Sequence, residues 1–238
     1  GLVGSEMCIR DRYNYLYETE PEPFMNNRKM FCPRGKMLGG SSSHNGMVHV
    51  RGNPMDFENW AQKDLKSWNY NNVLPYFKKS ESIEGLDETY RNKSGPLKLS
   101  RSSEGNELSK VYLEAAEQAG YEINNDMNGY KQEGFGLMDT TIYGGRRQST
   151  SVTYLHPVIN RRNLTVITNT IVNKVIIENN KAVGVECTKG KEIKKIHAEN
   201  EVILSAGAIN SPQLLMLSGI GNAEELKKLD ISVQHDLK

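Results

Sequence analysis

Cysteine, excess charge and long hydrophobic runs are all scarce in this sequence, and each scarcity excludes a class of protein. The three cysteines, Cys8, Cys32 and Cys187, are too few and too scattered for a disulfide framework, and they leave the redox compartment open. The formal net charge is only +1, so neither nucleic acid nor an anionic membrane is expected as a partner. No apolar run approaches the roughly 18 residues of a membrane-spanning helix, so no transmembrane segment is expected.

Metal-binding and hydrolase signatures are also missing. His44 and His49 do not have the i, i+4 spacing of a metal pair on a helix, and no cysteine or carboxylate completes a site beside them. We therefore expect no metal and interpret both as hydrogen-bonded histidines of a pocket wall. No Gly-x-Ser-x-Gly nucleophile elbow occurs at the strand-like segment before Gly207, so a hydrolase triad is not supported.

The two ends of the chain do not look like natural termini. Residues 1–12 have no methionine at position 1, no signal-peptide centre and no helical or strand period, so we interpret them as a non-native leader. Residues 226–238 end abruptly, as a truncated C-terminal segment would. The 238 residues are therefore expected to be an internal piece of a longer protein.

Helix and strand signals alternate along the chain and indicate a mixed α/β fold. Asn53-Pro54 predicts a helix start, and helices are expected over about 69–82 and 106–119. Ser149 or Ser151 is expected to cap another helix, which Pro157 ends. Residues 121–145 are expected to be mostly loop. Beyond residue 163 the pattern changes to short strands, at 164–168 and then a meander over 172–198, before a strand at 201–205 and a helix opening at Ser211-Pro212.

Two segments rich in glycine and other small residues carry the functional signal. Residues 32–46 read CPRGKMLGGSSSHNG, and residues 205–221 read SAGAINSPQLLMLSGIG. Glycine accepts positive φ and lets backbone N–H groups converge on an anion. An isolated Gly-Gly-Ser-Ser is more often a flexible turn, but the flanking Arg-Gly-Lys and Asn-Gly favour a phosphate-bearing cofactor.

Together these segments resemble the two signatures of the glucose-methanol-choline (GMC) family of flavin oxidoreductases. Residues 33–45 keep the pattern PRGKxLGGSSxxN, and residues 207–221 agree with the second signature throughout. The resemblance runs from about Tyr13 to the C-terminus. Within the family, the sequence of residues 33–60 is most similar to insect glucose-dehydrogenase-like enzymes. His44 and His49 depart from it, because the family usually has an aliphatic and an aromatic residue there.

The resemblance implies FAD as cofactor and a small alcohol or sugar as substrate, oxidised at its CH–OH group with hydride passing to flavin N5. The electron acceptor stays open. The implied cofactor-binding residues are Gly39, Gly40, Ser41, Asn45, Gly46, Val172 (against the adenine), Ala206 and Gly207. Close helix–strand packing also explains the small residues at 206–207, and an ordinary core valine is an equally good interpretation of position 172.

The same resemblance divides the chain into a partial FAD-binding domain, residues 13–52 and 164–225, and a partial substrate domain, residues 53–163. It places the family's catalytic pair, a histidine with a second histidine or an asparagine, beyond Lys238, so no catalytic residue is expected here. The Gly-x-Gly-x-x-Gly of a dinucleotide crossover is also absent. We therefore expect this fragment to be inactive alone. The alternatives are a truncated product without function and a GMC-fold lyase in which the flavin is structural.

Overall fold

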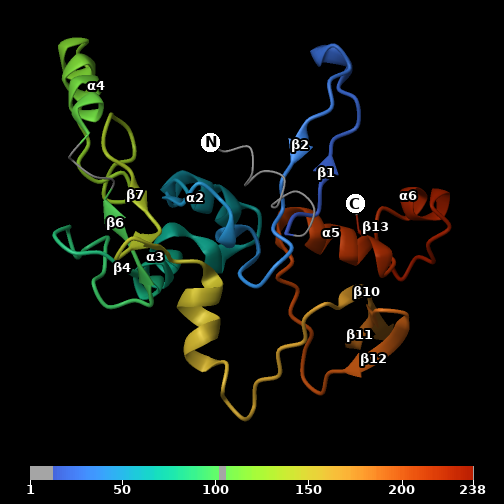
Figure 1. Ribbon diagram of the computed structural model, residues 1–238. Helices are drawn as coiled ribbons and strands as arrows, with labels where there is room; N and C mark the ends of the chain where they lie inside the picture. The colour runs from blue at the N-terminus through green and yellow to red at the C-terminus, as the bar shows by residue number, and fades with distance from the viewer. Residues whose placement is uncertain (1–12, 102–105, 238) are drawn as a thin grey trace. The chain divides into compact units, whose positions relative to one another are not determined.

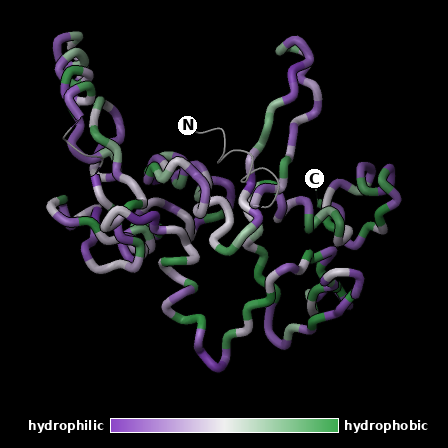
Figure 2. The backbone as a smooth tube through the Cα atoms, viewed as in Figure 1, coloured by the Kyte–Doolittle hydropathy of each residue, from purple (hydrophilic) through white to green (hydrophobic). Residues whose placement is uncertain are grey.

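The computed structural model describes residues 13–101 and 106–237. This part of the chain forms two compact units, one ending at Leu164 and the other beginning at Thr165 (Figure 1). Hydrophilic and hydrophobic residues are interspersed along both units (Figure 2). None of the helices in the described ranges is long and apolar enough to cross a membrane. The predicted leader, residues 1–12, lies outside the described residues.

A long hairpin opens the first unit. β1 (Tyr17–Glu18) pairs antiparallel with β2 (Phe31–Cys32), and a 3₁₀ turn at Pro23–Met25 forms the tip. The prolines in this segment predicted an extended surface course. The structure agrees, since Phe24 at the tip is 97% exposed.

Asparagine caps fix the three α-helices of the described part of the first unit. These helices are α2 (Pro54–Gln62), α3 (Tyr70–Ser80) and α4 (Glu107–Gln118). The side chains of Asn53, Asn69 and Asn106 accept hydrogen bonds from the first backbone N–H groups of their helices. The sequence predicted a helix at each of these places, and the structure confirms all three.

Aromatic contacts join α2 to α3. The ring of Phe57, which is buried, lies edge-on to Trp60 at 5.3 Å and to Phe77 of α3 at 5.6 Å. Tyr70, at the start of α3, lies 6.4 Å from the same ring. Each such pair adds roughly 0.5–1.5 kcal/mol beyond area burial, so Phe57 is the centre of this small apolar core.

Short strands connect distant loops of the first unit. β3 (Val48–His49), β7 (Asp139–Thr140) and β6 (Ser100–Arg101) form a three-stranded sheet in that order. β4 (Glu81–Ser82) pairs in parallel with β5 (Leu97–Lys98). β8 (Ile142–Tyr143) pairs antiparallel with β9 (Arg146–Arg147). β7 and β8 lie in the region expected to be mostly loop, because two-residue pairings leave little trace in a sequence.

A largely buried ionic cluster lies in the first unit. It consists of Arg51, Glu81, Arg91, Asp126 and Asp139. Arg91 donates to Glu81 Oε1 at 2.7 Å and to Asp139 Oδ2 at 2.8 Å, and it also pairs with Asp126. Arg51 Nη2 lies 2.8 Å from Glu81 Oε1, an ion pair without hydrogen-bond alignment. Glu81 is fully buried, so this unit depends on paired charges where a larger domain would use apolar residues.

The segment after β9 is helical but irregular. A π-helical turn covers Ser151–Leu155, and a 3₁₀ turn covers His156–Val158. Thr150 precedes the π-helical turn without a side-chain cap, so neither Ser149 nor Ser151 is at the cap position, although Ser149 Oγ accepts the N–H of Val152 at 3.4 Å. Pro157 does not end the helical segment as predicted, because it lies in the first turn of the 3₁₀ helix, where its missing N–H breaks no hydrogen bond.

An antiparallel meander forms the sheet of the second unit. β10 (Ile171–Glu178), β11 (Lys181–Lys189) and β12 (Glu192–His197) are ordered as in the sequence. Asn179 and Asn180 both have positive φ, 50° and 60°, in the tight turn between β10 and β11. The sequence predicted this meander. The grouping of residues 13–52 with 164–225 in one domain stays a prediction.

The rest of the second unit follows the meander. α5 (Gly207–Leu217) packs on β10, where Ser218 Oγ accepts the N–H of Val175 at 2.8 Å. After it come β13 (Ile220–Gly221), α6 (Ala223–Lys228) and β14 (His235–Asp236), with β13 and β14 parallel.

Three local predictions for the second half of the chain are wrong. Residues 164–168 and 201–205 are not strands, because no neighbouring described segment supplies a ladder of hydrogen bonds to them. The helix expected to open at Ser211-Pro212 begins at Gly207 instead, and Ser211 Oγ accepts the N–H of Ala206 at 3.0 Å. Ser211 is therefore an interior residue of α5 and not its N-cap.

Candidate functional site

The Gly-Ser loop, residues 35–46, folds around one 3₁₀ turn, Gly40–Ser43. Gly39 and Gly40 have φ of +89° and +52°, the left-handed region that residues with a Cβ avoid. At Gly35 an added Cβ would meet the carbonyl carbon of Gly40 at 2.3 Å, whereas at Gly40 and Gly46 it would meet no described atom within 4 Å. The loop is thus tight at its base and open at Gly40 and Gly46, as a site that admits a ligand requires.

The three serines of the Gly-Ser loop have different hydrogen-bond roles. Ser42 Oγ donates to the carbonyl of Gly39 at 2.5 Å, and Ser43 Oγ donates to the carbonyl of Leu38 at 2.9 Å. Ser41 Oγ instead accepts from the N–H of Gly35 at 3.1 Å, and no acceptor for its own hydrogen is found among the described residues. Of the three, Ser41 is therefore the hydroxyl free to donate to a ligand.

Arg147 and Thr150 hold the Gly-Ser loop from a distant part of the chain. The N–H of Thr150 donates to Ser42 Oγ at 2.9 Å, and Thr150 Oγ1 donates to the carbonyl of Gly39 at 3.2 Å. Arg147 Nη1 donates to the carbonyl oxygens of Ser42 at 3.2 Å and of Asn45 at 2.8 Å. Sequence reasoning missed both residues, since 102 positions separate Arg147 from Asn45 and no local pattern marks it.

The side chain of Asn45 has a fixed orientation. Its Oδ1 accepts from Arg147 Nη1 at 2.8 Å and from the N–H of Met47 at 3.1 Å. Both lone pairs of that oxygen are used, so the amide NH₂ lies on the opposite side of the group. Asn45 is exposed, which leaves this donor accessible.

The two histidines that depart from the GMC pattern have different surroundings. His49 Nε2 lies 3.3 Å from Glu81 Oε2, so it joins the edge of the ionic cluster, as the interpretation of a hydrogen-bonded histidine requires. His44 Nε2 is buried without a hydrogen-bond partner among the described residues, which does not fit that interpretation. Within the described ranges no group of His, Cys, Asp and Glu is arranged to hold a metal ion.

The remaining predicted site residues lie in the second unit. Val172, on β10 opposite Cys187, is 39% exposed and so is not the core valine of the alternative interpretation. Ala206 precedes α5, and Gly207 opens it with φ +90° and no described atom within 4 Å of an added Cβ. Asn210, one turn later, has a buried Oδ1 without a partner in the described part of the chain.

The structure therefore groups the predicted residues by unit. Gly39, Gly40, Ser41, Asn45 and Gly46 share one loop of the first unit, while Val172, Ala206 and Gly207 belong to the second. That one dinucleotide contacts both groups stays a prediction.

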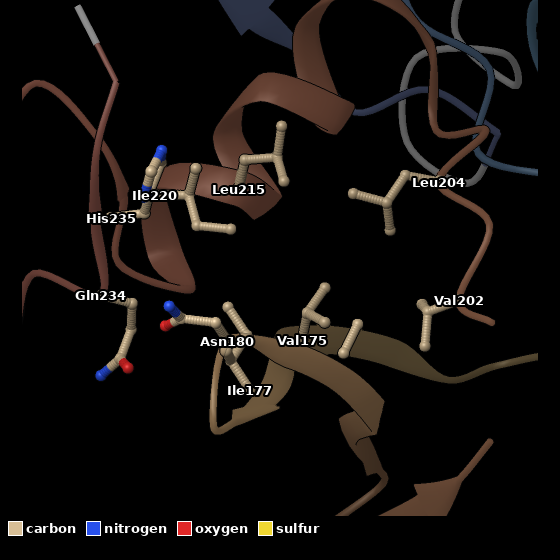
Figure 3. A pocket seen from close by; sticks show the side chains of 10 residues that line it. Val175, Ile177, Asn180, Val202, Leu204, Leu215, Ile220, Gln234 and His235 are labelled. Carbon is tan, nitrogen blue, oxygen red and sulfur yellow. The ribbon is translucent and has the colours of Figure 1, made fainter. Parts of the chain in front are cut away.

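An apolar cavity of about 440 Å³ lies within the second unit. Figure 3 shows the side chains of Val175, Leu204 and Leu215 directed into it from β10, the extended segment before α5, and α5 itself. None of the predicted cofactor-binding residues lines this cavity. The cavity is therefore not the predicted FAD site, despite its volume.

Comparison with known proteins gives the family. The GMC oxidoreductase family model matches residues 3–237. The chain is 49% identical over 229 residues to mitochondrial choline dehydrogenase of Mus musculus, covering 96% of this chain and 38% of that protein. It is also 49% identical to the oxygen-dependent choline dehydrogenase of Sinorhizobium fredii, covering 95% of this chain and 41% of that protein. The chain thus spans about two fifths of the length of these curated relatives.

Solved structures agree with this match. Pyridoxine 4-oxidase from Mesorbium loti superposes with a TM-score of 0.90 at 28% identity, over 96% of this chain and 45% of that one. Formate oxidase of Aspergillus oryzae RIB40, studied for its FAD modification, superposes with a TM-score of 0.86 at 26% identity, over 98% of this chain and 42% of that one. The expected mixed α/β fold and the expected FAD are both confirmed: the chain belongs to the GMC oxidoreductases, a family whose cofactor is FAD.

Proposed function

We propose that this chain is the FAD-holding part of an enzyme that oxidises the CH–OH group of a small alcohol. The observation that carries the proposal is the Gly-Ser loop. Its open positions at Gly40 and Gly46 and its unused donors on Ser41 and Asn45 are what an anionic, hydrogen-bonding cofactor needs. Membership of a flavoprotein family supports the same assignment.

Each group in the loop has a distinct part in holding FAD. Gly39 and Gly40 keep the backbone bare, so the diphosphate can approach it without a side chain between, although the N–H of Gly40 itself donates to the carbonyl of Met37 at 2.9 Å. Ser41 donates its free hydroxyl hydrogen, and Asn45 donates from its amide. In the second unit, Val172 offers an apolar surface to the adenine, and Ala206 and Gly207 leave room beside the start of α5.

FAD, when bound, accepts the hydride that leaves the alcohol carbon. The residues of this chain bind and orient the cofactor and shield it from water. We assign none of them as the base that removes the hydroxyl proton. Complete alcohol oxidation is therefore proposed for a full-length protein that includes this chain, and the chain alone is proposed to be inactive.

A choline-like alcohol is the leading substrate class. The two curated relatives described above are choline dehydrogenases at 49% identity, so they favour an alcohol carrying a quaternary ammonium over the glucose-type substrate of the insect subtype. The same relatives favour oxidation over a lyase reaction with structural flavin. Anaerobic reduction of the full-length protein by choline, compared with glucose, tests this choice. Bleaching of the flavin band by glucose and not by choline would reverse it.

Substitution of Ser41 tests the binding proposal. Ser41→Leu in the full-length protein removes the free donor, so FAD occupancy after purification should fall. Ser67→Leu, the same change at an exposed serine, is the matched control. Unchanged occupancy in Ser41→Leu would remove Ser41 from the site.

A further inference from the structure

Arg147 lies outside the Gly-Ser loop and donates hydrogen bonds to it. It lies on β9, and its guanidinium Nη1 contacts three oxygens of the loop: the carbonyls of Ser42 and Asn45 and the side-chain Oδ1 of Asn45. All three acceptors are neutral. The charge of Arg147 is therefore used to fix the positions of oxygens, not to neutralise a carboxylate there.

The contact with Asn45 Oδ1 determines which end of the amide faces outward. Turning the amide over would bring its NH₂ against two other donors, Arg147 Nη1 and the N–H of Met47. Two donor–donor contacts in place of two hydrogen bonds strongly disfavour that orientation. Arg147 thus fixes the orientation of the Asn45 amide, with Oδ1 towards Arg147 and the NH₂ group away from it.

The backbone around Asn45 is also held in an unusual conformation. Met47 has φ +63°, the left-handed region that a long side chain rarely adopts. Its carbonyl accepts the N–H of Thr141 at 2.8 Å, beside the β8–β9 hairpin that carries Arg147. Strained conformations persist where surroundings over-determine them, and they cluster at ligand clamps.

We propose that Arg147 is a positioning residue for FAD. It holds Asn45 so that the amide NH₂ faces the cofactor, and it does so without contacting the cofactor itself. This inference rests on the proposed FAD-binding role of the Gly-Ser loop and adds to it a residue that no sequence signature indicated.

The test is an FAD titration of the apo form of the full-length protein, followed by flavin fluorescence. Arg147→Met keeps the length of the side chain and removes its donors, and we expect it to raise the FAD Kd about tenfold, the effect of one charge-assisted hydrogen bond. Arg147→Lys should stay within about threefold of the wild type, because all three contacts come from one nitrogen, which an ammonium can replace. Arg146→Met, at the exposed neighbour on the same strand, is the matched control and should change nothing.

A double-mutant cycle separates positioning from a direct effect of charge. Asn45→Ala should weaken FAD binding, and the double variant should bind FAD less weakly than the product of the two single effects, because Asn45→Ala already removes the contact with Oδ1 and leaves Arg147 only the carbonyls of Ser42 and Asn45. If the two effects multiply, or if Arg147→Met binds FAD as the wild type does, the inference is wrong. Should Arg147→Met not fold, Arg147→Gln takes its place in the cycle. A wild-type protein that binds no FAD would overturn the proposed function itself, which is a different outcome.

Discussion

Gly40 combines a conformational requirement with open space. Its φ of +52° makes a Cβ unfavourable by about 1 kcal/mol, and an added Cβ would point where no described atom lies. Gly40→Ala is therefore expected to lower stability slightly but to weaken FAD binding clearly. The measurements are thermal unfolding of the apo form and FAD titration.

Gly85→Ala is the matched control for Gly40→Ala. Gly85 also has positive φ, +77°, and open space around an added Cβ, but it lies outside the Gly-Ser loop. It should show the same small loss of stability with unchanged FAD affinity. Equal loss of FAD affinity in both variants would mean that strain, not occupied space, explains the effect.

Glu81 is the residue on which the ionic cluster depends. Burial alone would raise the pKa of its carboxyl group, but hydrogen bonds from His49 and Arg91, together with the charge of Arg51, lower that pKa to about 2. A carboxyl group with a lowered folded-state pKa stabilises the fold above its ordinary pKa, and that contribution is lost as the pH falls. We therefore expect the urea midpoint to fall as the pH drops from about 4.5 towards about 2.

Glu81→Gln should abolish most of that pH dependence and lower stability already at neutral pH. It leaves Arg51 and Arg91 buried without their shared partner, a loss of about 3–5 kcal/mol for such pairs. Glu88→Gln, which breaks an exposed pair with Lys93, should cost little. A midpoint that does not respond to acid in the wild type would contradict the role given to Glu81.

The start of α2 shows how much one cap contributes to an element. Asn53 Oδ1 accepts the N–H of Met55 at 2.9 Å, and the Asn53 N–H donates to Asp56 Oδ2 at 3.2 Å, a reciprocal capping box. Asn53→Ala should destabilise the protein by about 1 kcal/mol, read from chemical denaturation. Asn71→Ala, at an exposed position within α3, should be neutral or slightly stabilising.

Elements that local chemistry determines were the ones that the sequence predicted. The Asn53-Pro54 start, the α4 pattern and the Asn179-Asn180 turn each need only neighbouring residues. Residues 164–168 and 201–205 have strand-like composition, yet a strand forms only when another segment pairs with it. The residues of the segment itself do not show whether such a partner exists. Arg147 was missed for the same reason, because its contacts with the Gly-Ser loop are long-range.

At the scale of the whole molecule, the sequence gives the family and the cofactor more readily than the substrate. Family membership and FAD followed from two short signatures, because close backbone approach to a cofactor tolerates few residue types. The substrate subtype did not follow. The sequence of residues 33–60 suggested an insect glucose-dehydrogenase-like protein, whereas the relatives described above are choline dehydrogenases. Substrate choice depends on side chains that the cofactor signatures do not include.

FAD retention should separate the chain as given from the full-length protein. The chain spans 38% to 41% of its curated relatives and lacks a Gly-x-Gly-x-x-Gly crossover, the element that holds the pyrophosphate at a helix N-terminus. With only part of the dinucleotide contacts, we expect the chain alone to purify colourless and the full-length protein to carry the yellow flavin band. One FAD per chain in the fragment, measured by visible absorbance after desalting, would show that the Gly-Ser loop and the start of α5 suffice to hold the cofactor.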